Sequence, residues 1–345
     1  MSAVDAALSS ADGALLLALW EARGRELPMG ELLKHVGGSQ AKVQRVLDDL
    51  AARGCRIERS PGGVRLVTAG LACWRDLIAS TARRDGRRLG RSAVVLPETA
   101  STNDAAWQVA GTQDSDGLVV LADYQAAGRG RLGRRWEAKA GQSVLMSVIL
   151  HDMPAESLDR LTLLAGLATA EGLERAMREA GGGGGMPAGG RIGIHWPNDL
   201  LVGGRKLAGI LVETRRLESA RGRIDAVVVG IGVNVAQGPA DFPADLASRG
   251  ISLFEACGSL LDRLRLVLAV LAGLEEHLAT ADRPGDAWLD RWKERCDMLG
   301  RSLTVRSGAR EITGQVLDVD PLQGLILRDE RGGTHFLSAR TSTLR

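Results

Sequence analysis

Apolar residues recur every three or four positions in the first part of the chain, a spacing typical of short amphipathic helices. The elements expected here are helices over 13–22, over 29–35 and from Ser39 onward, then strands over 57–59 and 64–67. Gly37-Gly38 forms a tight turn between two helices, where left-handed dihedrals cost little. This order predicts a winged helix-turn-helix unit over residues 1–70; the alternative is a small interaction domain on the same scaffold.

Residues 71–92 are expected to form a linker. Leu71, Trp74, Leu77 and Ile78 have the spacing of a short amphipathic helix. The same segment carries several arginines, namely Arg75, Arg83, Arg84, Arg87, Arg88 and Arg91. The pattern favours a solvated charged helix and hinge, and the alternative is contact with a nucleic-acid backbone.

The largest part of the chain, residues 93–295, mixes strand-like and helix-like segments without strict alternation. Strands are expected around 94–96, 118–121, 144–150, 192–196, 209–213 and 226–231, and helices over 103–110, 158–179 and 260–279. This mixture predicts an α+β domain with a mixed sheet. Gly181–Gly190 is a glycine-rich insert, and we expect a flexible joint there. Residues 296–345 contain four short strands separated by turns, which predicts a small SH3-like β-barrel.

Composition narrows the function. The 345 residues suggest two or three domains, and the formal net charge of +2 requires any nucleic-acid contact to be local. Aromatic residues are 3 % of the chain, too few for a surface that stacks successive bases. No membrane span or secretory signal is evident, and the four cysteines are scattered without zinc spacing. A reduced, cytoplasmic protein without a membrane partner or protein-bound metal is expected.

The third predicted helix is the candidate DNA-reading element. Its expected DNA-binding residues, in its first two turns, are Ser39, Gln40, Lys42, Gln44 and Arg45. Asp48 and Asp49 on the same helix are tolerable only if they face away from the DNA. Residues 1–70 contain nine basic and eight acidic residues, so this unit is nearly neutral.

Arginines and glycines alternate in the segment Gly128–Trp136, which reads GRGRLGRRW. It matches GxGxxG formally, but a β-type segment follows instead of the helix that a dinucleotide site needs. The arginines supply planar donors for carboxylate or phosphate, and the glycines permit a loop that closes over an anion. The alternative is an exposed basic turn.

Two further segments place polar groups at strand ends. Lys206 lies between a turn and an apolar strand, where an ammonium group can pair with a carboxylate. Asn198 and Asp199 offer polar groups for a ligand or Mg²⁺. Ser101-Thr102-Asn103 lies at a strand-to-helix joint. Each segment alone also fits ordinary turn or helix-capping chemistry.

Together these segments resemble the biotin–protein ligase family, and the whole layout resembles its bifunctional ligase/biotin operon repressor (BirA) form. The resemblance rests on an ordered set: Ser101-Thr102-Asn103, Tyr124–Ala127, Gly128–Trp136, Trp196-Pro197-Asn198-Asp199, Arg205–Glu213 and Gly230–Asn234. It implies a winged helix, a class II synthetase-like ligase domain over 93–295 and an SH3-like barrel. A lipoate or octanoate ligase on the related fold is disfavoured by the Gly128–Trp136 and Lys206–Glu213 segments.

The resemblance also implies the chemistry. Biotin and ATP, with Mg²⁺, give biotinyl-5′-AMP, and the biotinyl group passes to a lysine of a biotin carboxyl carrier protein. The implied catalytic residues are Lys206, Arg129 and Arg131. The implied biotin-binding residues are Ser101, Thr102, Asn103, Gln125, Arg129, Gly130, Arg131 and Lys206. The implied nucleotide-binding residues are Arg134, Trp136, Asn198, Asp199 and Asn234.

The resemblance implies, finally, a homodimer when the chain is loaded with biotinyl-5′-AMP, binding to operator DNA. The alternative is a ligase whose winged helix no longer represses. One departure concerns His195, because the family more often has lysine before the Trp-Pro-Asn-Asp motif. We expect His195 to be a strand-end residue.

Overall fold

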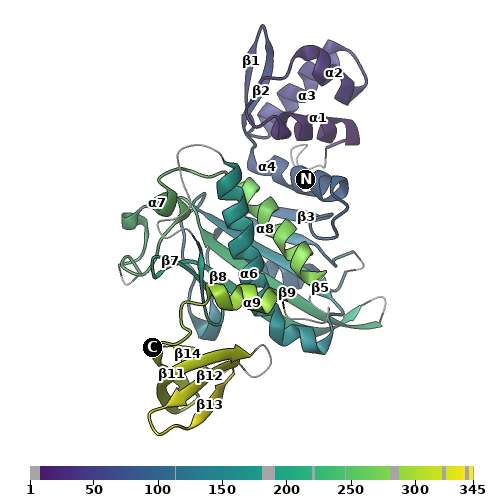
Figure 1. The fold of residues 1–345 in the computed structure, drawn as a ribbon. Helices are drawn as coiled ribbons and strands as arrows, with labels where there is room; N and C mark the ends of the chain where they lie inside the picture. Colours follow the sequence, from purple (N-terminus) through teal and green to yellow (C-terminus); the bar gives the residue numbers. More distant parts are fainter. Residues whose placement is uncertain are drawn as a thin grey trace.

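The computed structural model describes residues 8–112, 114–180, 191–219, 222–244, 246–279, 287–320, 324–338 and 342–344. A helical region at the N-terminus and a small sheet at the C-terminus lie at opposite ends of a central α+β region (Figure 1). The glycine-rich insert Gly181–Gly190 falls outside the described residues.

The N-terminal region contains three helices and a hairpin, as the apolar spacing predicts. The elements are α1 (Ser10–Glu21), α2 (Met29–Val36), α3 (Gln40–Ala52), β1 (Arg56–Ser60) and β2 (Gly63–Thr68). Gly37 ends α2 with a φ of 56°, a conformation that glycine adopts without a steric cost. β1 and β2 pair antiparallel. The apolar stripes of the helices, including Leu16 and Leu47, are fully buried between them.

The segment expected to be a hinge is a packed helix, α4 (Leu71–Arg84). The helix prediction is confirmed, but its solvated character is wrong, because Trp74, Leu77 and Ile78 are buried. α4 contacts α1, β3 (Ala93–Thr99) and α8 (Arg263–Leu278), so it joins the N-terminal region to the central one. From α8, the Arg263 guanidinium lies 5.1 Å from the Trp74 ring centroid.

The arginines around α4 are largely paired within the chain. Arg84 and Arg87 form ion pairs with Asp85, and Arg88 lies 3.0 Å from Asp116. These carboxylates neutralise much of the local positive charge. The arrangement therefore disfavours α4 as a surface for a nucleic-acid backbone.

The central region is built on a seven-stranded mixed sheet, as expected. The strand order is β3-β4-β5-β9-β8-β7-β6, in which only β3 and β4 are parallel among the described strands. The strands after β3 are β4 (Val119–Gln125), β5 (Ser143–His151), β6 (Gly193–His195), β7 (Asp199–Val202), β8 (Arg205–Ser219) and β9 (Gly222–Asn234). The helices are α5 (Thr102–Val109), α6 (Ala155–Glu179), α7 (Leu253–Cys257) and α9 (Ala287–Arg295).

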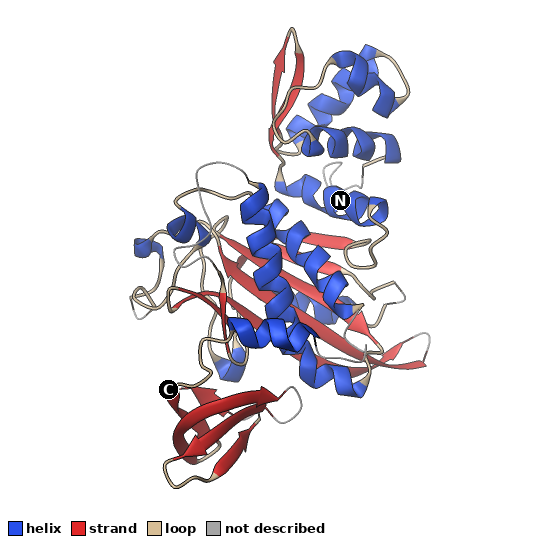
Figure 2. Ribbon diagram, in the orientation of Figure 1, coloured by secondary structure: helices blue, strands red, loops and turns tan. Residues whose placement is uncertain are grey.

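Helices cover the two faces of this sheet unequally. α6, α8 and α9 lie across one face (Figure 2). The short helix α5 packs on β4, β5 and β9, where Ala106 and Trp107 form a separate apolar cluster with Val120 and Val228. The rest of the α5 face is left for polar side chains and the Gly128–Trp136 segment.

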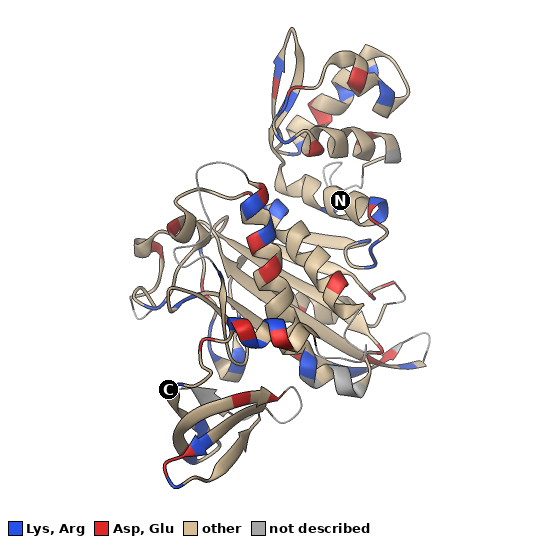
Figure 3. Ribbon diagram, in the orientation of Figure 1, with Lys and Arg blue, Asp and Glu red and all other residues tan. Residues whose placement is uncertain are grey.

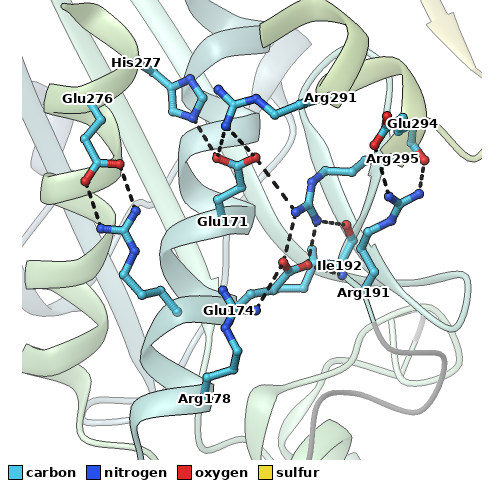
Figure 4. Close-up of polar contacts among 11 residues, drawn as sticks. Glu171, Glu174, Arg178, Arg191, Ile192, Glu276, His277, Arg291, Glu294 and Arg295 are labelled. Atoms are coloured by element: carbon cyan, nitrogen blue, oxygen red, sulfur yellow. Dashed lines mark hydrogen bonds and ion pairs between the residues drawn. The ribbon is translucent and has the colours of Figure 1, made fainter. Parts of the chain in front are cut away.

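The helix-covered face carries an ion-pair network among α6, α8 and α9 (Figure 4). Glu174 is 4 % exposed and accepts hydrogen bonds from Arg295 at 2.6 and 3.0 Å, and from the backbone N–H of Ile192 at 2.8 Å. Glu171 accepts from His277 at 2.9 Å and from Arg291 at 3.3 Å. The network ties α9 and the segment leading into β6 to α6.

Replacing Arg295 with methionine is expected to lower the free energy of unfolding by about 3 kcal/mol, because Glu174 then loses its main partner while it stays buried. Urea unfolding measures the loss. Arg191→Met is the matched control: Arg191 pairs with Glu294 at the exposed rim, 3.7 Å away, and should cost less than about 1 kcal/mol. Equal losses for the two variants would contradict the assignment.

The C-terminal region is a five-stranded antiparallel sheet of order β13-β12-β11-β10-β14. Its strands are β10 (Ser302–Ser307), β11 (Arg310–Asp320), β12 (Gly324–Asp329), β13 (Thr334–Leu337) and β14 (Ser342–Leu344). The first four match the expected strands, and β14 is additional. Among the helices that the structure describes, none has both the length and the hydropathy to cross a bilayer.

Candidate functional site

The first part of the site lies at the N-terminus of α5. The Oε1 atom of Gln125 accepts hydrogen bonds from the backbone N–H of Thr102 at 2.7 Å and from its hydroxyl at 3.0 Å. Ser101 occupies the N-cap position, yet its side chain makes no capping hydrogen bond, and it is 3 % exposed. The simple capping interpretation of Ser101 is therefore wrong. Gln125 supplies the acceptor, which leaves the Ser101 hydroxyl for another partner.

Asn103 lies against the sheet because β9 has a glycine beneath it. A Cβ atom at Gly230 would lie 2.3 Å from Asn103 Oδ1, so only glycine permits this approach. Ser147 donates to Asn103 Oδ1 at 2.6 Å, and Asn103 Nδ2 donates to Glu213 at 2.9 Å. Asn103 is thus fixed by β5, β8 and β9 together, and its amide is fully engaged within the chain.

The Gly128–Trp136 segment, called the flap below, folds back on itself beside the sheet. The backbone N–H of Gly130 donates to the Arg134 carbonyl at 2.7 Å, and that of Trp136 to the Gly128 carbonyl at 2.9 Å. A 3₁₀ turn over Arg131–Gly133 forms the tip, where the Leu132 side chain is exposed. The expected loop is therefore an ordered hairpin in this structure.

Two carboxylates hold the first arginine of the flap. Arg129 forms an ion pair with Asp104 of α5 and lies 3.6 Å from Glu213 of β8. The hydrogen bond with Asp104 raises the pKa of the Arg129 guanidinium. Neither acid was predicted as a site residue, although Glu213 ends the Lys206–Glu213 motif, where a lone carboxylate after an apolar strand is a usable signal.

The second arginine of the flap points toward the Trp-Pro-Asn-Asp segment. Arg131 donates to Asn198 Oδ1 at 3.1 Å, and Asn198 Nδ2 donates to the Ile210 carbonyl at 2.9 Å. Burial lowers the pKa of the Arg131 guanidinium, while the nearby Asp199 carboxylate opposes this effect. A half-buried guanidinium with few competing acids is available to an anionic ligand.

Trp136, at the end of the flap, lies over two glycines that face each other across neighbouring strands. Gly209 of β8 and Gly232 of β9 are direct cross-strand partners. Cβ atoms built at these positions would lie 3.3 Å and 2.7 Å from the Trp136 ring. The ring therefore needs both glycines to lie this close to the sheet.

A bulge in β8 directs Lys206 to the same side. Leu200 and Leu201 of β7 pair with Ala208 and Lys206, so β8 has one extra residue there. Lys206 Nζ lies 2.7 Å from Asp199 Oδ1 and 5.9 Å from the Trp136 ring centroid. In a regular strand, Lys206 and Gly209 would project to opposite faces. The bulge thus brings the ammonium group onto the α5 face.

Three predicted residues do not present free side chains to this surface. Asn234 is buried, and its amide donates to the carbonyls of Lys206 at 3.3 Å and Ile251 at 3.1 Å. Arg134 is an exposed side chain of the flap. His195 lies 2.9 Å from Asp297, which fits the expected strand-end role. Asn234 serves the backbone around Lys206 in this structure.

The metal question rests on the same side chains. Among the described residues, no group of three or more His, Cys, Asp or Glu could hold an ion. Asp199 is the carboxylate beside Lys206 and Arg131, and Mg²⁺ commonly takes one or two protein carboxylates together with substrate phosphates. One carboxylate therefore fits a magnesium ion that arrives with phosphate.

The five candidate DNA-binding residues lie on the first half of α3 or at its N-cap. Gln40 and Arg45 are exposed, and Ser39 makes no capping hydrogen bond. Lys42 donates to the Val36 carbonyl at 2.6 Å, and Gln44 accepts from Arg59 of β1 at 3.1 Å.

The acids of α3 pair with arginines of the same region. Asp48 lies 2.6 Å from Arg59, and Asp49 lies 2.8 Å from Arg53. Figure 3 shows both signs of charge on this region, as the near-neutral count predicts.

Fold and site together define a mixed-sheet α+β protein with an arginine flap over a polar floor. A family comparison matches residues 95–234 to the biotin/lipoate A/B protein ligase family. The chain is 32 % identical over 264 residues to the biotin–[acetyl-CoA-carboxylase] ligase of Mycobacterium tuberculosis, covering 72 % of this chain and 87 % of that protein. The chain belongs to the biotin/lipoate A/B protein ligase family.

Two further relatives cover different shares of the chain. A "Bifunctional ligase/repressor BirA" from Bacillus subtilis is 29 % identical over 331 residues, covering 94 % of this chain and 96 % of that protein. The solved biotin protein ligase from Aquifex aeolicus, in complex with biotin and ATP, matches with a TM-score of 0.58 and 26 % identity, covering 73 % of this chain and 98 % of that chain.

Proposed function

We propose that this chain is an ATP-dependent biotin–protein ligase. A biotin carboxylate oxygen attacks the α-phosphorus of ATP, pyrophosphate leaves, and biotinyl-5′-AMP forms. A lysine amine of a biotin carboxyl carrier protein then attacks the acyl carbon, and AMP leaves. The observation that supports this best is the convergence of Arg131, Lys206 and Trp136 on one face of the sheet beside Asn198 and Asp199.

Each proposed role follows from position. Ser101, Thr102 and Gln125 form a polar end without a charged partner, suited to the uncharged ring of biotin. Arg131 and Lys206 offset the charge that develops on the α-phosphate. These two groups lie at opposite ends of the Asn198-Asp199 segment, so a carboxylate and a phosphate can lie between them.

The remaining predicted residues extend this surface. Gly130 gives the flap its turn, and Arg129 is anchored at the α5 end by Asp104 and Glu213. Trp136 and Asn198 border the nucleotide, and Arg134 projects from the flap toward solvent. Asn234 and Asn103 support the site through the backbone of Lys206 and through Glu213. Asp199 would hold Mg²⁺, which supplies further positive charge to the phosphates of ATP.

The ligase proposal has a direct test. Purified chain, ATP, Mg²⁺ and biotin are incubated with a biotin carboxyl carrier domain, and labelling of the acceptor lysine is measured by mass spectrometry. We expect biotin to be transferred and lipoate or octanoate to be transferred poorly. Transfer of lipoate in place of biotin would support the other branch of the family. No transfer of either would overturn the proposal.

We further infer that the N-terminal region is a winged helix that binds operator DNA, and that the C-terminal sheet is an SH3-like barrel. The support for the first is the succession of α2, a glycine turn, α3 and the β1–β2 hairpin. Repression would require a homodimer loaded with biotinyl-5′-AMP, so that two α3 helices meet a palindrome. A ligase with a winged helix that no longer represses is the alternative, favoured by the near-neutral charge of the region.

Arg45→Ala is expected to weaken operator binding about 10-fold, the usual effect of losing one arginine contact to a base or phosphate. The measurement is a gel shift with a biotin-operon palindrome, with and without biotin and ATP. Arg331→Ala, at an exposed turn of the C-terminal region, is the control and should leave the shift unchanged. Absence of any shift in the unmodified protein would favour the ligase-only alternative.

A further inference from the structure

Two cysteines that are separated by 18 residues meet at the junction between the N-terminal region and α4. Cys55 lies between α3 and β1, and Cys73 lies in the first turn of α4. Their sulfur atoms are 3.4 Å apart. Cysteine spacing alone treats all four thiols as scattered, because only the return of the chain through the β1–β2 hairpin brings these two together.

The surroundings differentiate the two sulfur atoms. The hydrogen bond from Cys73 lowers the pKa of the Cys55 thiol against the opposing effect of burial, and the Gly70 N–H and the Arg53 charge add to the lowering. The Gly70 nitrogen lies 3.4 Å from Cys55 Sγ. The same hydrogen bond and burial raise the pKa of Cys73. Cys55 is 6 % exposed and Cys73 is 0 % exposed, so a small oxidant meets Cys55 first.

We propose that Cys55 and Cys73 are a redox-sensitive dithiol that a hydroperoxide oxidises to an intramolecular disulfide. The Cys55 thiolate attacks a peroxide oxygen, the O–O bond breaks, and a hydroxide leaves as water, giving a sulfenic acid. The Cys73 sulfur then attacks the Cys55 sulfur, the S–O bond breaks, and the second hydroxide leaves with the Cys73 proton. Two thiols and one hydrogen peroxide thus give one disulfide and two waters.

Little movement separates the two states. The sulfur atoms must approach from 3.4 Å to the bonded distance of about 2.05 Å. The backbone is already closely packed here, since a Cβ at Gly70 would lie 2.2 Å from the Arg53 carbonyl oxygen. The disulfide would close the 55–73 loop, which contains the whole β1–β2 hairpin. It would join the end of α3 covalently to α4, the helix that contacts the central region.

The experiment uses the reduced full-length chain. It is treated with hydrogen peroxide under native conditions, free thiols are blocked by alkylation, and the protein is digested with trypsin. Residues 54–56 and 66–75 are the tryptic peptides that contain Cys55 and Cys73. We expect mass spectrometry to find these two peptides linked, and the link to disappear on reduction. The oxidised protein should also show slower amide hydrogen exchange over 55–73 and a higher melting temperature.

Controls separate this pair from the other thiols. The Cys257→Ala/Cys296→Ala double variant should still form the linked peptide, whereas Cys55→Ala and Cys73→Ala should each prevent it and prevent the rise in melting temperature. A link that forms only after denaturation would overturn the proposal. So would alkylation of both Cys55 and Cys73 after peroxide treatment, or a link to Cys257 or Cys296. None of these outcomes depends on ligase activity.

Discussion

Lys206→Met should lower the rate of biotinyl-5′-AMP formation by roughly 10²–10³-fold, the size of effect seen when one preorganised electrostatic donor is removed from a reacting centre. Methionine keeps much of the length of the side chain and removes its charge. The bulge in β8 directs Nζ toward the α5 face, where it lies 2.7 Å from Asp199. Pyrophosphate release at saturating biotin and ATP measures the chemical step.

Arg205→Met is the matched control for this variant. Arg205 is the preceding residue of β8, but its guanidinium pairs with Glu255 of α7, 3.1 Å away, and not with Asp199. We expect pyrophosphate release within about two-fold of the unmodified protein, since only a partly exposed ion pair is lost. If both variants lost activity equally, the loss would reflect disruption of β8 and not the Lys206 charge.

The order of motifs along the chain predicts the membership of the site well. Thr102, Gln125, Asn198 and Lys206 are separated by as many as 104 residues, yet they lie on connected segments around one sheet face. Strand and helix periodicity also predicts most elements, because the apolar faces of long elements decide their burial. Short elements such as β7, with four residues, lack enough periods to be recognised.

Features that depend on tertiary contact escape prediction from the sequence. α4 has as many arginines as a solvated helix would, but its apolar side is covered by α1 and α8, so it is a packed connector. The bulge that reorients Lys206 depends on pairing with β7 and leaves no local signature. Asp104 is an ordinary acid in the first turn of a helix until the flap places Arg129 beside it.

The glycines under Trp136 give the second large expected effect. Gly232→Ala should lower adenylate formation by about 10²-fold, because its Cβ would lie 2.7 Å from the Trp136 ring and force the end of the flap away from the sheet. Gly209→Ala places its Cβ 3.3 Å from the same ring, a contact that a small shift relieves. We expect a loss of only a few-fold there, and pyrophosphate release measures both.

A double-mutant cycle identifies the ring as the cause of this loss. If the alanine at 232 acts by displacing Trp136, then Gly232→Ala should cause almost no further loss when it is added to Trp136→Ala, and the two effects should be strongly non-additive. If the alanine instead distorts β9, which carries both Gly230 and Gly232, the losses should multiply, because the strand would be disturbed whether or not the ring is present. Multiplying losses would therefore show that the glycine pair shapes the sheet and does not seat the flap.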